Sequence, residues 1–266
     1  MAASIGIVGC GAIGRSLVRE AQSGGIPPVA GVASRNAEKA RAFLSELSEP
    51  PPYLDLEDLI DRSTLVVETA GGHVVPDLAR QTFDAGKDLM VISVGALLDH
   101  PEVMDRSRET GCRLMAPSGA IAGLDGIKSA CAGGVDRVTM VTRKPPEALE
   151  GAPYLVENGI DLEGLDHEMD VFYGTAREAC WAFPANVNVS AAVSLAGLGP
   201  DRTMIRIMAV PGLGRNCHDV EVEGEFGLLT IHIENTPTEN PRTGRLTVLS
   251  IIRSVRDAAD PVRIGT

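Results

Sequence analysis

The sequence lacks an excess of positive charge, a long apolar run and a paired set of cysteines. Its 24 Lys and Arg residues face 36 Asp and Glu residues, a net charge of −12, which argues against nucleic acid or an anionic membrane as a partner. We expect neither a membrane span nor a secretory signal, because no run of about eighteen apolar residues and no basic leader is present. The cysteines are odd in number, scattered and without a Cys-x-x-Cys pair, which predicts no disulfide framework, no metal site and a reducing, cytoplasmic compartment: Cys10, Cys112, Cys131, Cys180 and Cys217.

The chain does contain a glycine-rich turn directly after the short apolar run Ile5–Val8. The segment Gly9-Cys10-Gly11-Ala12-Ile13-Gly14 has the spacing Gly-x-Gly-x-x-Gly and leads into an amphipathic segment. In such a unit the first glycine permits a tight turn, the second lets the backbone approach a pyrophosphate, and the third allows close packing of helix and strand. Backbone N–H groups at the helix start then face the phosphates. We therefore predict a dinucleotide site with contacts from Gly9, Gly11, Ala12, Ile13 and Gly14.

The end of the second predicted strand, Val29–Ala33, bears on which dinucleotide binds. A site specific for NAD has an acidic residue there for the ribose 2′-hydroxyl, whereas this chain has Ser34-Arg35-Asn36. A hydroxyl and a guanidinium suit a 2′-phosphate, because arginine offers a fork of donors to phosphate oxygens. Ser34 and Arg35 are thus predicted to contact the cofactor and to admit NADP, with use of both NAD and NADP left open. The alternative is that Arg35 is a solvated residue beside Glu38.

Strands and helices alternate through the rest of the first half. The apolar run Leu65–Ala70 is typical of a buried parallel strand. Further strands are expected at 89–94 and 112–116, with helices at 37–47, 56–60, 76–85 and 102–110. This alternation predicts a Rossmann-type, doubly wound parallel sheet over residues 1–118. Such sheets hold ligands at the carboxyl ends of their strands, so Ala70 and Gly71 are predicted to contact the cofactor, while His73 either lines the cleft or is solvated.

The second half, residues 119–239, has a different pattern. Small residues dominate Pro117–Gly126, and Arg137–Arg143 alternates polar and apolar side chains as a half-buried strand does. After these we expect a helix to about residue 131, a loop over 144–164, a strand over 169–173 and a short helix over 175–181. We predict an α+β domain with a mainly antiparallel sheet that binds the substrate and forms a dimer.

Two asparagines stand at a predicted helix start within Phe183–Ala192. Asparagine is a favoured N-cap, but one cap does not need both Asn186 and Asn188. The other asparagine can bind a carboxamide such as that of nicotinamide, because its side chain offers both a donor and an acceptor.

Two later segments with period-two alternation differ in where they place a histidine. In His218–Glu223, His218 shares a face with valines and lies opposite the acidic residues, so it is predicted to point toward the covered side of the sheet. In Leu229–Glu234, His232 shares its face with polar residues and is predicted to face solvent. A covered histidine is either a satisfied core residue or a catalytic one.

A final helix is predicted within 240–266. Its apolar residues recur at helical spacing and are expected to pack on the first domain: Leu246, Leu249, Ile252 and Val255.

Five segments together resemble the bacterial and archaeal L-aspartate dehydrogenases, in order and over nearly the entire chain. The block Phe183–Val189 is much more discriminating than the glycine turn. The segments are Gly9-Cys10-Gly11-Ala12-Ile13-Gly14, Ser93-Val94-Gly95-Ala96-Leu97, Pro117-Ser118-Gly119-Ala120-Ile121-Ala122-Gly123, Phe183-Pro184-Ala185-Asn186-Val187-Asn188-Val189 and Asn240-Pro241-Arg242-Thr243.

The resemblance implies an activity and roles for three residues. Ala122 and Asn188 match the family's NAD(P)-binding positions, and His218 matches its active-site histidine. The implied reaction is oxidative deamination of L-aspartate to iminosuccinate, which is hydrolysed to oxaloacetate and ammonia or diverted to NAD biosynthesis, in a homodimer. Many relatives have an acidic residue before the arginine, whereas this chain has Ser34-Arg35, which puts strict NAD preference in doubt.

Aspartate brings two carboxylates to a chain of negative net charge, so cations must reach the cleft. Lys144, Arg242 and Lys128 are candidates, as are helix N-termini. Two other functions stay open: a related amino-acid or imine oxidoreductase, such as a homoserine dehydrogenase relative, and a non-catalytic dinucleotide sensor that has kept the fold.

Overall fold

A computed structural model describes residues 3–184, 187–236, 244–262 and 264–265 of the chain. These residues divide into two compact units. One runs to Pro117 and resumes at Val248 in the last helix, and the other runs from Ser118 to Thr247 and includes Ile264 and Gly265. Within the described residues, no helix combines the length and the apolar character needed to cross a membrane.

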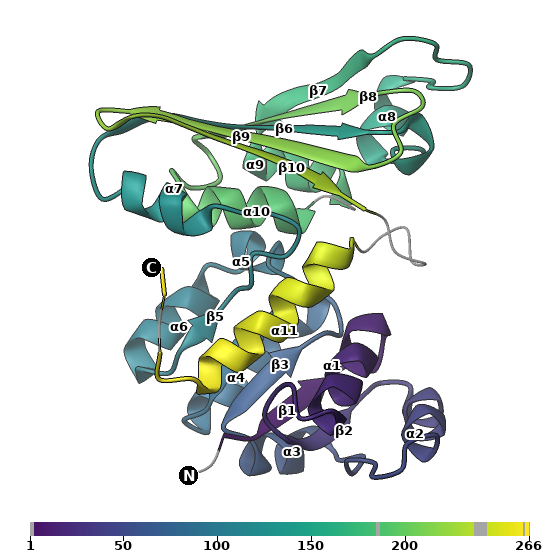
Figure 1. Cartoon of the computed structure of the whole chain (residues 1–266), viewed down its shortest axis with the longest axis vertical. Coiled ribbons are helices and arrows are strands. Elements are labelled where there is room, and N and C mark those ends of the chain that lie inside the picture. Colours follow the sequence, from purple (N-terminus) through teal and green to yellow (C-terminus); the bar gives the residue numbers. More distant parts are fainter. Residues whose placement is uncertain (1–2, 185–186, 237–243, 263, 266) are drawn as a thin grey trace. The chain divides into compact units, whose positions relative to one another are not determined.

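The first unit contains a parallel sheet with the strand order β2-β1-β3-β4-β5 (Figure 1). Its strands are β1 (Ile5–Val8), β2 (Val29–Ala33), β3 (Leu65–Glu68), β4 (Asp88–Val91) and β5 (Leu114–Met115). Its helices are α1 (Ala12–Gln22), α2 (Ala37–Ser45), α3 (Leu56–Arg62), η1 (Gly72–Val74), α4 (Val75–Asp84), α5 (Ala96–Asp99), α6 (Glu102–Thr110) and α11 (Arg245–Ala259).

Helices cover both faces of this sheet. Ile5 and Ile7 of β1 belong to a buried cluster with residues of α1, α2 and α11. On the opposite face a Cβ added to Gly6 would lie 2.6 Å from the side chain of Leu59 in α3. The predicted doubly wound parallel sheet is therefore confirmed.

The closing helix α11 packs on the first unit as predicted, with Ile252 and Val255 of the predicted stripe against its core. Ile251 and Val255 are buried in the cluster that includes Ile5. The predicted core residues Leu246 and Leu249 are exposed, Leu249 by 53 %. The prediction is thus confirmed for Ile252 and Val255 and wrong for Leu246 and Leu249, because the exposed side of α11 also carries leucines.

The second unit contains a mixed sheet with the strand order β10-β9-β6-β8-β7. Strand β6 is parallel to β8, while the other neighbours pair antiparallel, so the mainly antiparallel sheet is confirmed. The strands are β6 (Val135–Lys144), β7 (Met169–Thr175), β8 (Thr203–Ala209), β9 (Asn216–Gly224) and β10 (Gly227–Asn235). Strand β8 was not expected from the sequence.

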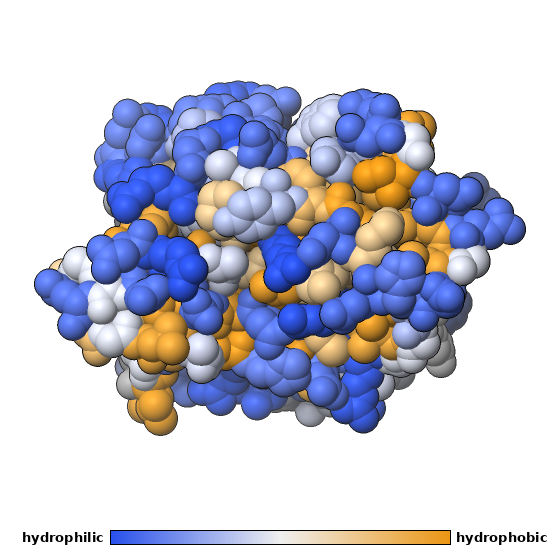
Figure 2. Space-filling model, turned by 90° about the horizontal axis from the view of Figure 1, so that it is seen from above, coloured by the Kyte–Doolittle hydropathy of each residue, from blue (hydrophilic) through white to orange (hydrophobic). Residues whose placement is uncertain are grey.

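One face of this second sheet carries ion pairs together with exposed apolar side chains. Arg137 on β6 pairs with Glu221 and Glu223 on β9, at 2.8 and 2.9 Å. Tyr173 on β7 and Leu228 on β10 are exposed by 67 % and 61 %. Figure 2 looks onto this face from above and shows hydrophilic surface interrupted by apolar patches. The face is thus neither uniformly polar nor a continuous apolar patch.

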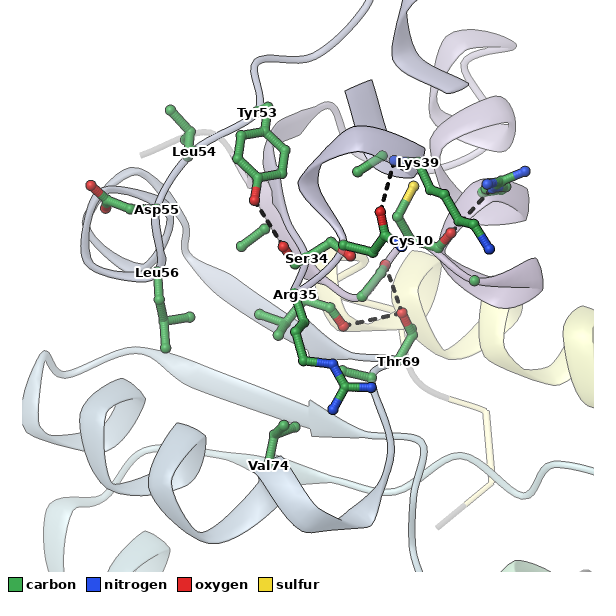
Figure 3. Close-up of a pocket in the computed structure, with 18 of the residues that line it drawn as sticks. Cys10, Ser34, Arg35, Lys39, Tyr53, Leu54, Asp55, Leu56, Thr69 and Val74 are labelled. Atoms are coloured by element: carbon green, nitrogen blue, oxygen red, sulfur yellow. Dashed lines mark hydrogen bonds between the residues drawn. The ribbon is translucent and has the colours of Figure 1, made fainter. Parts of the chain in front are cut away.

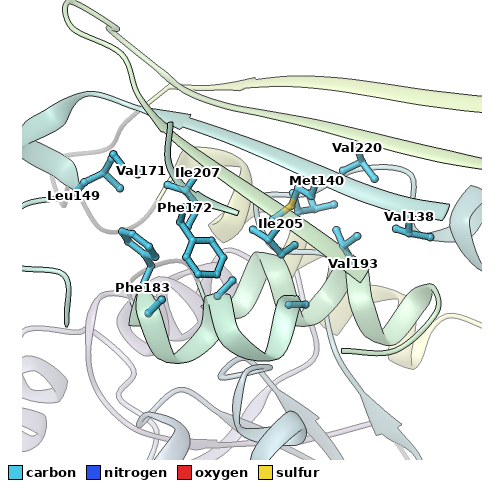
Figure 4. Packing of buried hydrophobic residues seen from close by; sticks show 14 of the residues in the cluster. Val138, Met140, Leu149, Val171, Phe172, Phe183, Val193, Ile205, Ile207 and Val220 are labelled. Atoms are coloured by element: carbon cyan, nitrogen blue, oxygen red, sulfur yellow. The ribbon is translucent and has the colours of Figure 1, made fainter. Parts of the chain in front are cut away.

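The other face of the second sheet is covered by helices and forms the unit's core. Phe172, Phe183, Ile205 and Ile207 are buried there with Val193 of α10 (Figure 4). The helices are α7 (Leu124–Ala130), η2 (Pro146–Ala148), α8 (Pro153–Asn158), α9 (Ala176–Ala182) and α10 (Val187–Ala196). The expected loop over 144–164 is partly wrong, because η2 and α8 form within it.

Candidate functional site

A pocket in the first unit lies at the carboxyl ends of β1, β2 and β3. Its volume is about 590 Å³, within the range of small-molecule and cofactor sites. Figure 3 shows Ser34, Arg35 and Thr69 among its lining residues. The pocket brings together these predicted cofactor residues: Gly9, Gly11, Ser34, Arg35 and Ala70.

The three glycines of the turn differ in their surroundings. Gly9 has φ +107°, and a Cβ there would lie 2.7 Å from the carbonyl atoms of Thr69. A Cβ on Gly14 would lie 2.2 Å from the carbonyl oxygen of Gly9. Around Gly11, at the N-cap of α1, a Cβ would meet nothing within 4 Å. Gly9 and Gly14 thus serve the turn itself, while Gly11 leaves space through which a phosphate can approach the helix start.

The other predicted cofactor residues are divided between the units. Ala12 and Ile13 open α1, and Gly71, with φ +108°, precedes η1. Ala122 is an exposed residue of the second unit, as is Asn188 inside α10. Asn186 lies outside the described residues. His73 was expected either to line the cleft or to be solvated, and it does both, since it is exposed and also lines the pocket.

The end of the pocket at β2 is rich in hydrogen-bond donors. Arg35 and Lys39 line it, and the Arg35 side chain extends toward Thr69 and Val74 (Figure 3). The Tyr53 hydroxyl donates to the carbonyl of Ser34 at 2.8 Å, which fixes the turn that carries Arg35. Neither Lys39 nor Tyr53 was predicted from the sequence, because a pocket wall is assembled from segments whose spacing in the sequence shows no pattern.

A second arrangement lies in the second unit, around His218 on β9. This side chain is buried, with 3 % of its surface exposed, which confirms the predicted orientation toward the covered side. The strand register sets it opposite Thr142 of β6, and the Thr142 hydroxyl lies 3.1 Å from His218 Nδ1. The bond to Nδ1 orients the ring and leaves Nε2 for another partner.

Lys144 lies two residues after Thr142 and therefore on the same side of β6. Burial lowers the pKa of its ammonium to about 8. Burial, followed by the charge of Lys144, lowers the pKa of His218 to about 4. The imidazole is therefore neutral at physiological pH and able to accept a proton, beside a cation that can bind an anion.

The remaining candidates lie elsewhere. His232 is exposed as predicted, and its bonds to Asp219 and Glu234 raise the pKa of its imidazole. Lys128 is exposed on α7, and Arg242 lies outside the described residues. Within the described part of the chain, no group of three His, Cys, Asp or Glu side chains is placed to hold a metal ion.

Known families match both halves of the chain. Residues 9–117 match the family described as homoserine dehydrogenase, NAD-binding domain, and residues 125–258 match that described as aspartate dehydrogenase, C-terminal. An L-aspartate dehydrogenase from Methanosarcina mazei is 46% identical over 98% of this chain and 99% of its own length. "L-aspartate dehydrogenase 3" from Bordetella bronchiseptica is 39% identical over 98% of this chain and 97% of its own.

Solved structures give the same picture. The aspartate dehydrogenase from Thermotoga maritima is 26% identical and superposes with a TM-score of 0.76 over 100% of both chains. A homoserine dehydrogenase from Thiobacillus denitrificans, at 14% identity and a TM-score of 0.61 over 98% of this chain and 75% of its own, shares the fold alone. The near full-length relatives at 46% and 39% identity decide the assignment: this chain belongs to the L-aspartate dehydrogenase family.

Proposed function

We propose that this protein catalyses the reversible, NAD(P)-dependent oxidative deamination of L-aspartate to iminosuccinate, which water converts to oxaloacetate and ammonia. The observation that carries the proposal is the buried, neutral His218, held by Thr142 and lying near the desolvated cation of Lys144. The reaction needs a base and a site for carboxylates, and these residues supply both. The curated relatives named L-aspartate dehydrogenase match over nearly the full chain, which supports the same assignment.

The pocket of the first unit fits a dinucleotide. Its glycine turn leaves the start of α1 open beside Gly11, and the lining includes Ser34 and Ala70. A dinucleotide held there would supply a nicotinamide ring as the acceptor of the hydride from the substrate α-carbon. We assign cofactor contacts to these residues, to the remaining members of the turn and to Gly71, Ala122 and Asn188.

We further propose that the pocket accepts NADP as well as NAD. Arg35 and Lys39 supply positive charge where the adenosine ribose would lie, after β2. Asp55, a carboxylate that also lines the pocket, accepts a bond from the Asp58 amide at 2.9 Å as the N-cap of α3. Its charge is therefore directed at the helix start, so a 2′-phosphate meets donors and little repulsion.

His218 acts as the base in this proposal. With Nδ1 held by the Thr142 hydroxyl at 3.1 Å, Nε2 can take a proton from the water that attacks the imine. A pKa of about 4 in the free protein keeps the imidazole neutral, and a bound dianion raises this pKa toward the working pH. Lys144 binds one substrate carboxylate and thereby places the α-carbon.

The second unit also suits self-association. Its sheet face with the Arg137 ion pairs carries exposed Tyr173 and Leu228, and a mixture of apolar and charged groups is typical of interfaces. We propose a homodimer that uses this face. We also propose a reducing, cytoplasmic location, in keeping with five free thiols. Iminosuccinate released before hydrolysis would supply NAD biosynthesis.

Initial rates at 340 nm test the activity. We expect reduction of NAD or NADP with L-aspartate, and little with D-aspartate, L-glutamate or L-homoserine. Turnover with L-homoserine alone would favour the related oxidoreductase. Cofactor binding without turnover in either direction would favour the non-catalytic sensor.

A further inference from the structure

Glu68 is a buried acid that neither the glycine turn nor the catalytic histidine explains. It ends β3, and its side chain is fully buried, with 0 % exposed. Its Oε1 accepts bonds from the amides of Ala70 and Gly71, both at 2.7 Å, and from the Ser93 hydroxyl at 3.1 Å. Its Oε2 accepts the Ser93 amide at 2.9 Å. The carboxylate thus satisfies four donors from two separate segments.

These bonds link the ends of two neighbouring strands. Ala70 and Gly71 form the turn after β3, and Ala70 lines the cofactor pocket. Ser93 follows β4, the next strand in the sheet. Thr69, the residue after Glu68, donates its hydroxyl to the carbonyl oxygens of Val8 and Gly9, at 3.1 and 3.0 Å. This bond ties the same turn to the end of β1, the strand on the other side of β3. The turn is therefore fixed on both sides.

The order of strands indicates which part of the cofactor this turn serves. The strands run β2-β1-β3-β4, with Ser34 after β2 and Gly11 after β1. An adenosine ribose at β2 and a pyrophosphate at β1 leave the nicotinamide half for the ends of β3 and β4. We propose that Glu68 is a positioning residue that shapes the turn Ala70–Gly71 and Ser93 for the nicotinamide nucleoside, an inference that rests on the proposed function.

Glu68→Gln is the most direct perturbation, because it keeps the shape and changes the bonding. A carboxylate accepts at both oxygens, whereas an amide has one oxygen and one donor group. Either orientation of the amide sets its NH₂ against backbone N–H donors, from Ser93 or from Ala70 and Gly71. One anchored segment must move, so nicotinamide contacts weaken while the β2 end of the pocket is unaffected.

The test compares NADH with ADP, which lacks the nicotinamide nucleoside. NADH fluorescence gives its Kd, and displacement of NADH gives the Ki of ADP. We expect Glu68→Gln to raise the Kd of NADH at least about tenfold and to leave the Ki of ADP within twofold. The exposed Glu57→Gln, also in the first unit, is the matched control and should change neither value.

A Kd for NADH within twofold of wild type, or an equal rise for NADH and ADP, would overturn the proposal. Ser93→Ala, which removes one donor and keeps the amide, provides a second test if Glu68→Gln does not fold. It should raise the Kd of NADH about two- to fourfold with ADP unchanged, and no rise would refute the role. A wild-type protein that binds neither compound would instead refute the proposed function, together with this inference.

Discussion

Replacing Lys144 with Met should stabilise the fold and weaken binding of the substrate. Burial lowers the pKa of this ammonium from 10.5 to about 8, which corresponds to about 3 kcal/mol against the charged form in the folded state. That penalty is present below pH 8 and disappears as pH rises to the unfolded value of 10.5. The Met side chain avoids it, so Lys144→Met should raise Tm at pH 7 by at least about 2 °C, and the difference should vanish near pH 10.5.

The same substitution should weaken the binding of aspartate. A charged hydrogen bond to a carboxylate contributes about 1.5–3 kcal/mol, so Lys144→Met should raise the KM for aspartate roughly 10- to 100-fold. In the wild type this KM should also rise with pH above about 8, as the ammonium loses its proton. The variant should lack that rise, and the comparison cancels the titration of aspartate itself.

Initial rates at 340 nm with saturating cofactor, measured from pH 7 to 10, give the KM for aspartate of the wild type and of the variant at each pH. The exposed Lys128→Met on α7 is the control and should leave the KM within twofold. A Lys144→Met enzyme with a KM within threefold of wild type at pH 7.5 would refute the assignment of the carboxylate to Lys144. A lower Tm in that variant would contradict the penalty attributed to burial.

Three further changes test other parts of the molecule. His218→Ala should lower kcat about 10²-fold or more with NADH binding within twofold by fluorescence, and near-wild-type turnover would exclude it as the base. Arg35→Ala should lower kcat/KM for NADP at least about tenfold while changing that for NAD little; an equal loss for both would show that Arg35 does not read the 2′-phosphate. Ile251→Ala should cost about 2–4 kcal/mol in urea unfolding of the first unit, because the side chain is buried in its core; a loss below about 1 kcal/mol would contradict that packing.

Local pattern predicted most of the first unit. Strand β2 and helix α6 have the predicted bounds, because a buried apolar run and an amphipathic repeat are each visible in a single segment. The same reasoning missed β8. Its inward residues, such as Ile205 and Ile207, alternate with Met204 and Met208, so apolar side chains on both faces hide the period of two.

Helix α8, within the loop expected over 144–164, was not predicted for a different reason. Helix α8 is short, beginning at Pro153 and ending before Gly159 in the left-handed region. Proline at a helix start and glycine after its end are the expected signals, but six residues offer too little periodicity to add to them.

The candidate site was only partly accessible to sequence reasoning. The inward orientation of His218 followed from alternation within one strand. Its partner Thr142 lies 76 positions away in the chain, and only the register of β6 with β9 brings the two together. Glu68 did leave a signal, as an acid that directly follows the apolar residues of β3, but its four donors become evident only in the folded chain.

Helix α11 has a consequence for how the protein is made. The first unit's core needs Ile251 and Val255, yet the ribosome supplies them only after residues 118–247. At 5–20 residues per second this delay is on the order of ten seconds, during which the nascent sheet keeps apolar residues uncovered. The second unit can then fold before the first is complete, and the apolar surface that α11 later covers is available for chaperones to bind.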